Sequence, residues 1–226
     1  MGKVIAIDGP AGTGKSTVAR KVAQHLGYLF LDTGAMYRAV TYQLLAKRID
    51  LLDVEAIKTV LSDFRLEVQE VHGEKRYFLE GEEITETIRS SEVSRNVSAV
   101  SALPCVRESL VVIQQRSVQG HNAVCEGRDM GTVVFPRARY KFFLVARSEV
   151  RAQRRYQEML AKDPDLAQTQ SQVLLDLMQR DELDSTRQIS PLRAAEDAIL
   201  VDTSDWTIDQ VVQHILEKVA AGEKTS

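Results

Sequence analysis

Hydrophobic and polar positions follow two alternating patterns along the chain. Short, uninterrupted apolar runs rich in β-branched residues are typical of strands buried in a parallel sheet. Longer stretches carry apolar residues at every third or fourth position, which is typical of amphipathic helices. The short runs predict strands at residues 3–8, 28–31, 123–125, 141–146 and 198–201. The longer stretches predict helices at residues 15–26, 35–47, 104–119, 148–161, 169–183 and 207–221.

The alternation of strands and helices predicts an α/β fold, a three-layer sandwich in which helices cover both faces of a mostly parallel central sheet. Residues 64–84 depart from this order. Apolar and polar residues alternate from Phe64 to Val68, and Tyr77–Leu79 follows a turn at His72–Gly73. This pattern predicts a small antiparallel β insert.

A glycine-rich segment lies between the first predicted strand and the first predicted helix. It matches the pattern G-x-x-x-x-G-K-[ST] at every position and ends in Lys15 and Ser16. In this setting, backbone N–H groups and the positive end of the helix surround phosphate oxygens. Lys15 would reach the β- and γ-phosphates of ATP, and Ser16 would offer its hydroxyl to Mg²⁺. The predicted ATP-binding residues are Gly9, Pro10, Ala11, Gly12, Thr13, Gly14, Lys15, Ser16 and Thr17.

The composition of the 226 residues is that of a globular protein the size of one full domain. Hydrophobic residues make up 44% and charged residues 27%, which excludes disordered, collagen-like and coiled-coil chains. The net charge of −3 argues against a general nucleic-acid binder, which has a basic excess. From Arg107 to Arg193 there are 12 Arg and only 2 Lys. Arginine forks fit phosphate oxygens and favour a phosphorylated small molecule as ligand, although codon bias alone gives the same excess.

Several features predict a cytoplasmic location. Cys105 and Cys125 form no C-x-x-C pair, which argues against a disulfide scaffold or a cysteine zinc site and fits a reducing compartment. No apolar run approaches the roughly 20 residues that a membrane span needs. The chain enters its first strand at once, so we expect no signal peptide.

The motif alone predicts a nucleotide but not a reaction. Asn96 and Asn122 are the only asparagines, and neither is followed by Lys, so the guanine-reading N-K-x-D of GTPases is missing. ATP-driven motors usually need a longer chain than this one. A small kinase that phosphorylates a small phosphorylated acceptor fits the arginine excess best.

Four segments carry a resemblance to a known family. They are Ile7–Pro10 (IDGP), Asp32–Arg38 (DTGAMYR), Glu126–Pro136 (EGRDMGTVVFP) and Arg180–Arg187 (RDELDSTR). With these segments and the β insert, the chain resembles the bacterial cytidylate kinases of the nucleoside monophosphate kinase family over nearly its whole length. Thr33 stands where some members have Ser, and Glu126 where some have Asp, so both functional groups are kept. The resemblance implies direct, in-line transfer of a phosphoryl group from ATP to CMP or dCMP.

The resemblance also implies roles at the acceptor nucleotide. Arg38 and Arg128 would hold its phosphate, although Arg38 could instead be a solvated helix residue. Asp129 would accept from the cytosine amino group, and its alternative is a loop cap. Arg107 would donate to N3 and O2, and Ser98 would add a hydrogen bond. Without the resemblance, surface positions would be the favoured interpretation for Arg107 and Ser98.

Residues near the end of helix 169–183 would complete the substrate contacts. Asp184 would bind the sugar hydroxyls, and Arg180 and Arg187 would reach the phosphates. A salt-bridged helix end is the alternative for Arg180. The predicted substrate-binding residues are Thr33, Arg38, Ser98, Arg107, Arg128, Asp129, Arg180, Asp184 and Arg187.

A predicted helix carries four arginines at spacings that place them on one face, Arg147, Arg151, Arg154 and Arg155. In the family this region, residues 148–166, is a lid over ATP, and Arg151 and Arg155 are the favoured phosphate contacts. Glu126 would hold a magnesium-bound water or would make only a polar loop contact. The predicted catalytic residues are Lys15, Arg128, Arg151, Arg155 and Arg187.

We therefore expect a single P-loop kinase domain with three parts. The core is predicted at about 1–35, 104–147 and 190–226, the CMP-binding region with the β insert at 36–103, and the lid at 148–166. We expect a monomer that needs no obligate protein partner, no nucleic acid and no membrane. The alternatives are a kinase for UMP, AMP or shikimate, and a non-catalytic nucleotide-binding module.

Overall fold

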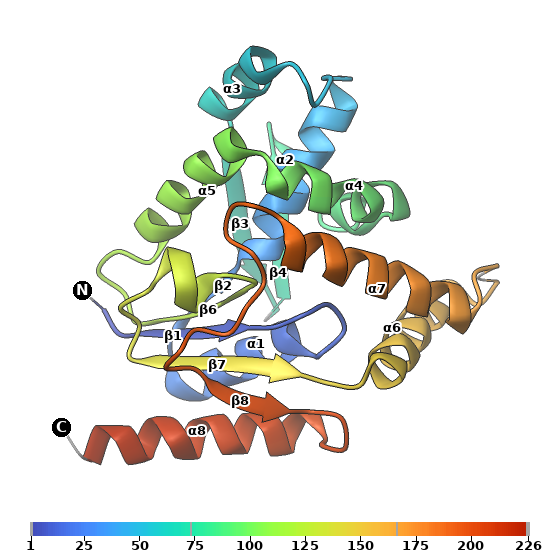
Figure 1. The fold of residues 1–226 in the computed structure, drawn as a ribbon. Helices are drawn as coiled ribbons and strands as arrows, with labels where there is room; N and C mark the ends of the chain where they lie inside the picture. Colours follow the sequence, from blue (N-terminus) through green and yellow to red (C-terminus); the bar gives the residue numbers. More distant parts are fainter. Residues whose placement is uncertain (1, 73, 166, 225–226) are drawn as a thin grey trace. The chain divides into compact units, whose positions relative to one another are not determined.

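The predicted strands form one parallel sheet in the order β2-β6-β1-β7-β8 (Figure 1). Every neighbouring pair in this sheet is parallel. The sheet has the mostly parallel character that the alternation of elements predicts. Its strands are β1 (Val4–Asp8), β2 (Leu29–Asp32), β6 (Ala123–Gly127), β7 (Tyr140–Val145) and β8 (Ile199–Asp202).

The computed structural model describes residues 2–72, 74–165 and 167–224. The chain divides into two units, and the first contains the parallel sheet. The first unit comprises Met1–Asp32 and Ser117–Ser226, and the second comprises Thr33–Arg116.

The core of the first unit lies between the sheet and two helices, α1 (Lys15–Leu26) and α8 (Ile208–Lys224). Because β1 and β7 are interior strands, their side chains on this face are fully covered. The buried cluster includes Ile5, Ile7, Val18, Val22, Phe142, Leu144, Val212 and Ile215. Burial of these side chains supplies most of the free energy that holds the strands in register.

Two further helices of the first unit, α6 (Ser148–Lys162) and α7 (Gln170–Thr186), pack against each other. Their small apolar cluster joins Ala152, Val173 and Leu177 to Ala11 of the glycine-rich loop. A capping box starts α7, because Thr169 Oγ1 accepts from the Gln172 N–H and Gln172 Oε1 accepts from the Thr169 N–H. The glycine-rich loop is therefore in direct contact with the arginine-bearing helices.

The second unit combines helices with the predicted antiparallel insert. The insert has three strands in the order β3-β4-β5, one more than a simple hairpin. It buries Tyr77 and Leu79 on one face. The elements of this unit are α2 (Thr33–Ala46), α3 (Val54–Ser62), β3 (Leu66–Val71), β4 (Glu74–Leu79), β5 (Glu82–Glu83), the short η1 (Thr87–Arg89), α4 (Ser91–Ala102) and α5 (Pro104–Ser117).

The predicted fold class is confirmed, a mostly parallel sheet with flanking helices and a small antiparallel sheet. Two helices, α3 and α4, were not predicted. Both carry ordinary start signals, since Asp53 accepts from the Ala56 N–H and Ser90 Oγ accepts from the Val93 N–H.

Membrane-spanning potential is weak in the part of the chain that the structure describes. There, no single helix is long and apolar enough to cross a membrane. The pair α4 and α5 passes that length and composition test only when joined across a 94° bend.

Two leucines in neighbouring strands test the importance of the core. Leu144 in β7 is 0% exposed, whereas Leu200 in β8 is 65% exposed. We expect Leu144→Ala to lower the free energy of unfolding by about 2–5 kcal/mol, because it removes buried methyl groups and leaves a cavity. The matched variant Leu200→Ala should stay within about 0.5 kcal/mol of the parent in urea denaturation. Equal losses in both variants would contradict this placement of the core.

Candidate functional site

The glycine-rich loop, residues 9–14, connects the end of β1 to the start of α1. Gly9, Gly12 and Gly14 adopt φ values of 144°, 77° and 87°, which disfavour any residue with a Cβ. A Cβ on Gly9 would lie only 2.1 Å from the carbonyl oxygen of Leu144. The glycines of the motif are therefore required by the path of the backbone around a phosphate-sized turn.

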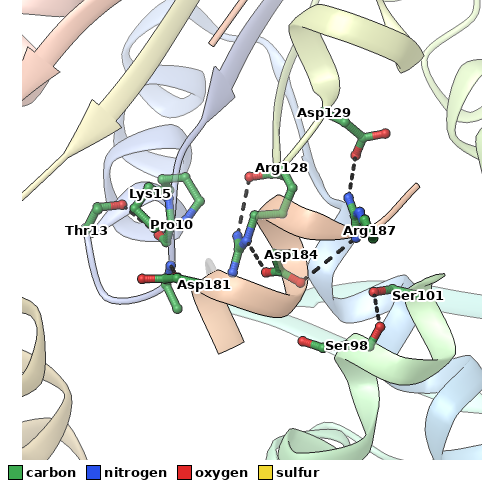
Figure 2. Close-up of polar contacts among 12 residues, drawn as sticks. Pro10, Thr13, Lys15, Ser98, Ser101, Arg128, Asp129, Asp181, Asp184 and Arg187 are labelled. Carbon is green, nitrogen blue, oxygen red and sulfur yellow. Dashed lines mark hydrogen bonds and ion pairs between the residues drawn. The ribbon is translucent and has the colours of Figure 1, made fainter. Parts of the chain in front are cut away.

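Lys15 is buried within this loop. Its Nζ donates a hydrogen bond of 2.7 Å to the carbonyl oxygen of Pro10, so the side chain folds back over the loop (Figure 2). Burial, reinforced by the positive charge of Arg128, lowers the pKa of Lys15 below its ordinary value. An anion bound in the loop would favour the charged form, because it would supply the negative charge that the site lacks.

Ser16 and Glu126 bring two oxygens together at the start of α1. The Ser16 Oγ donates to Glu126 Oε1 at 2.6 Å. Burial, followed by the nearby charge of Asp32, raises the pKa of Glu126 to about 7. A hydroxyl beside a carboxylate fits a hard cation such as Mg²⁺. Among the described residues, no three His, Cys, Asp or Glu side chains form a metal-binding group, so phosphate oxygens and water would have to complete its shell.

A cluster of charged side chains lies beyond the ends of the strands, which we call the arginine cluster: Arg128, Asp129, Arg180, Asp184 and Arg187. Arg128 Nε donates to Asp184 Oδ2 at 2.9 Å, and Arg187 Nη1 lies 3.9 Å from Asp184 Oδ1 (Figure 2). Arg187 Nη2 lies 3.9 Å from Asp129 Oδ1. The cluster thus brings together five predicted substrate residues of the first unit.

The electrostatics of the arginine cluster favour an anion. Burial alone would raise the pKa of Asp184, but the charges of Arg128, Arg180 and Arg187 outweigh it and lower the pKa. Burial, followed by the charge of Arg128, lowers the pKa of Arg180 to about 10. Three guanidinium groups lie with two carboxylates in this cluster, and the carboxylates of Glu126 and Asp181 also act on Arg128. The guanidinium groups could form charge-assisted hydrogen bonds with a phosphate group.

Asp129 occupies a turn immediately before the π-helical segment η2 (Met130–Val134). Its side chain makes no capping hydrogen bond to this segment. Asp129 therefore does not cap η2, and its Oδ1 lies 3.9 Å from Arg187 Nη2. Its part in base recognition stays a prediction.

The four arginines of α6 do not share one environment. Arg151 is buried and donates to the carbonyl oxygen of Ala11 at 3.0 Å and to Asp181. Arg155 pairs with Glu158 on the same helix at 2.9 Å. The other two, Arg147 and Arg154, contact Asp205 and the carbonyl oxygen of Thr203 after β8. Arg151 thus brings a positive charge from α6 to the glycine-rich loop.

Asp181 is a site residue that the sequence reasoning left without a role. Its carboxylate accepts from the Ala11 N–H at 3.3 Å and also pairs with Arg151. It thereby links the glycine-rich loop, α6 and α7. Asp181 lies in the segment Arg180–Arg187 that carries the family resemblance, but its partners are 170 and 30 residues away in the chain, so the sequence does not indicate its contacts.

The remaining predicted substrate residues belong to the second unit. Arg38 on α2 donates to Ser94 Oγ at 2.8 Å and to the carbonyl oxygen of Ile88 at 3.1 Å. Thr33, the first residue of α2, is buried. Arg38 is therefore a bonded, half-buried side chain and not a freely solvated one.

Arg107 and Ser98 are both buried in the second unit. Arg107 is only 2% exposed, its Nη1 donates to the carbonyl oxygen of Ser101 at 3.2 Å, and its guanidinium lies 5.4 Å from the centre of the Tyr37 ring. The Ser98 carbonyl accepts from Ser101 Oγ at 3.0 Å. The surface interpretation of both residues is therefore wrong.

Comparisons with known proteins bear on the whole chain. A family model described as cytidylate kinase matches residues 5–221. Relatives named cytidylate kinase include one from Protochlamydia amoebophila, 49% identical over 216 residues and covering 95% of both chains. Another, from Ligilactobacillus salivarius, is 51% identical over 213 residues and covers 94% of both. An uncharacterised protein of known structure from Eubacterium ventriosum has a TM-score of 0.51 at 12% identity, covering 98% of this chain and 99% of its own, which shows a likeness of fold alone.

The raised pKa of Glu126 predicts a pH-dependent stability. The unfolded chain releases this proton near pH 4.5 and the folded protein near 7, so the folded state binds more protons in between. The free energy of unfolding should therefore fall as pH rises through this window. The pKa of Asp8 is raised from 3.8 to about 6, so Asp8 also makes the free energy of unfolding fall as pH rises, but at lower pH. The interval from pH 6 to 7 is therefore the one that reports on Glu126.

We expect Glu126→Gln to reduce the fall in unfolding free energy between pH 6 and 7, by at most about 1.4 kcal/mol for one proton. Urea denaturation of the ligand-free protein at several pH values measures this. The exposed Glu196→Gln serves as the control and should keep the parent slope. An unchanged slope in Glu126→Gln would show that its carboxyl is already ionised in the folded protein at pH 6.

Proposed function

The chain belongs to the cytidylate kinase family, and from this premise we propose that it transfers the γ-phosphoryl group of ATP to CMP or dCMP. The products are ADP and the corresponding nucleoside diphosphate. One observation carries the proposal beyond the family match. Asp8 of β1 and Gly127 of β6 are register partners, so the glycine-rich loop and Arg128 leave neighbouring strands at the same level. This placement suits a site at the carboxyl edge of the sheet.

On the donor side, the backbone N–H groups of residues 9–17 would surround the phosphates of ATP, and Lys15 would neutralise charge on the β- and γ-phosphates. The Ser16 hydroxyl and the Glu126 carboxylate would hold Mg²⁺, directly or through water. The ion would supply positive charge that offsets the charge developing on the phosphates. The 2.6 Å hydrogen bond between these side chains supports this assignment.

On the acceptor side, Arg128, Arg180 and Arg187 would hold phosphate groups, with Arg38 assigned to the acceptor phosphate by the resemblance. Phosphoryl transfer demands chiefly positioning and charge stabilisation, so no strong base is needed. When a phosphate takes over the guanidinium of Arg128, its present partner Asp184 becomes available for a sugar hydroxyl. The pairing of Arg128 with Asp184 supports this exchange.

Base recognition is assigned to Asp129, Arg107 and Ser98, and Thr33 belongs to the same substrate set. Asp129 would accept from the exocyclic amino group of cytosine, which uracil lacks. A site built for one hydrogen-bonding pattern leaves polar groups unpaired with the other pattern. The burial of Arg107 and Ser98 supports such a site, because a buried polar group that loses its partner is costly.

The lid is proposed at residues 148–166, of which residue 166 lies outside the described residues. Arg151 and Arg155 would contact the transferring phosphoryl group and exclude water. The contact of Arg151 with the glycine-rich loop supports its share of this role. A cytoplasmic location and a monomeric state stay predictions from the sequence.

Nothing favours a different acceptor or a non-catalytic module over cytidylate phosphorylation. A panel of CMP, dCMP, UMP, AMP and shikimate, each assayed with ATP and Mg²⁺ for ADP release, tests the proposal directly. Highest turnover with CMP or dCMP is expected. Binding of ATP without turnover of any acceptor would support the non-catalytic alternative instead.

The proposed role of Lys15 predicts that a variant without this lysine folds but has almost no catalytic activity. Lys15→Ala removes the positive charge assigned to the β- and γ-phosphates, so we expect kcat to fall by about a thousandfold or more. The thermal transition should stay near that of the parent. Lys218→Ala, at an exposed position of α8, is the control and should keep its activity. Near-normal kcat in Lys15→Ala would rule out the assignment of the loop.

The proposed roles of Asp129 and Arg38 predict different specificities. Asp129→Asn should reduce the preference for CMP over UMP by about ten- to a hundredfold, because an amide can also donate to O4 of uracil and a hydrogen bond to a charged group contributes about 1.5–3 kcal/mol. Arg38→Ala should weaken CMP and UMP by the same factor, since a phosphate contact carries no base information. The measurement is kcat/KM for both acceptors in variants shown to be folded. If Asp129→Asn lowers kcat/KM for CMP and for UMP by the same factor, base recognition would be assigned to Ser98 and Arg107 instead.

A further inference from the structure

The last residue of β1, Asp8, is a buried carboxylate that has no part in the roles assigned above. It is 4% exposed and accepts two backbone hydrogen bonds, from the N–H groups of Met130 and Gly131, each at 2.8 Å. Its two oxygens are used separately, Oδ1 for Met130 and Oδ2 for Gly131. A buried carboxylate bonded in this way is fixed in position and fixes its partners.

Both of these N–H groups open η2, and the first N–H groups of a helical segment have no acceptor within it. The segment is closed by wide-ring hydrogen bonds, in which Val134 donates to the carbonyl oxygen of Asp129 and Phe135 to that of Met130, at 3.1 and 2.7 Å. The residue that precedes η2, Asp129, makes no side-chain cap. Asp8 therefore acts as the cap of η2, although it belongs to a different strand.

The residues joined by this cap adjoin both substrate-binding loops. Asp8 is followed directly by Gly9 of the glycine-rich loop, and Met130 is preceded directly by Arg128 and Asp129. Gly131 packs closely against this neighbourhood, because an added Cβ would lie 3.1 Å from Lys141 Cδ and 3.4 Å from Asp8 Oδ2. One side chain thus ties the start of the ATP loop to the loop that carries two predicted acceptor residues.

We infer that Asp8 is a positioning residue for phosphoryl transfer, whose carboxylate fixes Arg128 and Asp129 relative to the glycine-rich loop. This inference rests on the proposed function for its consequence, because it assigns Arg128 and Asp129 to the acceptor. We assign Asp8 no contact with either substrate, since its two oxygens are engaged by the Met130 and Gly131 N–H groups. Its loss affects acceptor binding and turnover and leaves ATP binding intact, since both of its hydrogen bonds go to the acceptor loop.

The pH of the experiment is chosen so that the carboxyl group of Asp8 is ionised. Burial raises its pKa to about 6, against the effect of the two hydrogen bonds from Gly131 and Met130. The charges that face it are Asp129, which raises the pKa further, and Lys15, which lowers it. At pH 8 the carboxylate is ionised and accepts both hydrogen bonds.

The test compares Asp8→Asn and Asp8→Ala with the parent at pH 8. The asparagine keeps the shape but turns an amide N–H toward a backbone donor, and the alanine removes both acceptors. We expect KM for CMP to rise and kcat to fall, by about ten- to a hundredfold in kcat/KM, as displaced reacting groups imply. The Kd for ATP, measured by calorimetry, should stay within about twofold of the parent. The preference for CMP over UMP should also decline, because Asp129 is displaced.

A buried control separates positioning from general loss of stability. Ile215→Val lies in the core of the first unit and should lower the thermal transition without changing KM for CMP. If the Asp8 variants lose ATP affinity as much as CMP affinity, or lose neither, the inference is overturned.

Hydrogen exchange in the parent provides a test that needs no variant. The Met130 and Gly131 amides should exchange as slowly as those of β1, and fast exchange of both would overturn the capping role even if the variants do not fold. Turnover by the parent keeps the two proposals apart. If the parent fails to phosphorylate CMP, the proposed function fails, whereas slow exchange at Met130 and Gly131 would still support the cap.

Discussion

The parallel register between β1 and β6 is the constraint on which the rest of the site depends. Burial of both strands restricts them to apolar residues until their carboxyl ends, where Asp8 and Glu126 are the buried exceptions. Because the strands are parallel and aligned, their carboxyl ends coincide, and both following loops start at one edge of the sheet. The register makes the glycine-rich loop and the Arg128 loop neighbours, and the carboxylate of Asp8 adds a side-chain link between them.

The charged groups buried at the carboxyl edge of the sheet lower the free energy of unfolding. Burial disfavours the charged forms of Lys15, Glu126 and Arg180, as the directions of their pKa shifts show. The apolar cluster between the sheet, α1 and α8 offsets that cost. Asp184 and Asp181 reduce the cost further, since each pairs with an arginine in the ligand-free protein. The arginines are thereby held in place before any phosphate arrives, which is the preorganisation that phosphoryl transfer requires.

Local sequence patterns predict much of the secondary structure. Contacts between residues far apart in the chain cannot be predicted from such patterns. The first helix was predicted at 15–26 and is found at Lys15–Leu26, because its start at the motif and its stop at Gly27 are both local signals. Helix α3 was missed although Asp53 caps it, because its nine residues offer too few turns for a clear period. The contacts of Asp8 with Met130 and of Asp181 with Ala11 span 122 and 170 residues, and no periodicity encodes such pairs. Roles for Arg107 and Ser98 came from the family resemblance, since their own sequence context favoured the surface.

The different roles proposed for Lys15 and Arg128 explain why the glycine-rich loop carries a lysine and the arginine cluster carries arginines. Lys15 folds over its own loop to Pro10, and its proposed role would need it to reach a phosphate, which suits a compact charge on a flexible stem. In the proposed site, the partner of Arg128 would change from the carboxylate of Asp184, to which its Nε donates, to a phosphate. A planar guanidinium can present N–H donors to either anion in one orientation, so the proposed exchange would not require the group to turn. A lysine at position 128 would satisfy the charge but would not preserve the orientation, and the acceptor phosphate would lose its alignment with the ATP loop.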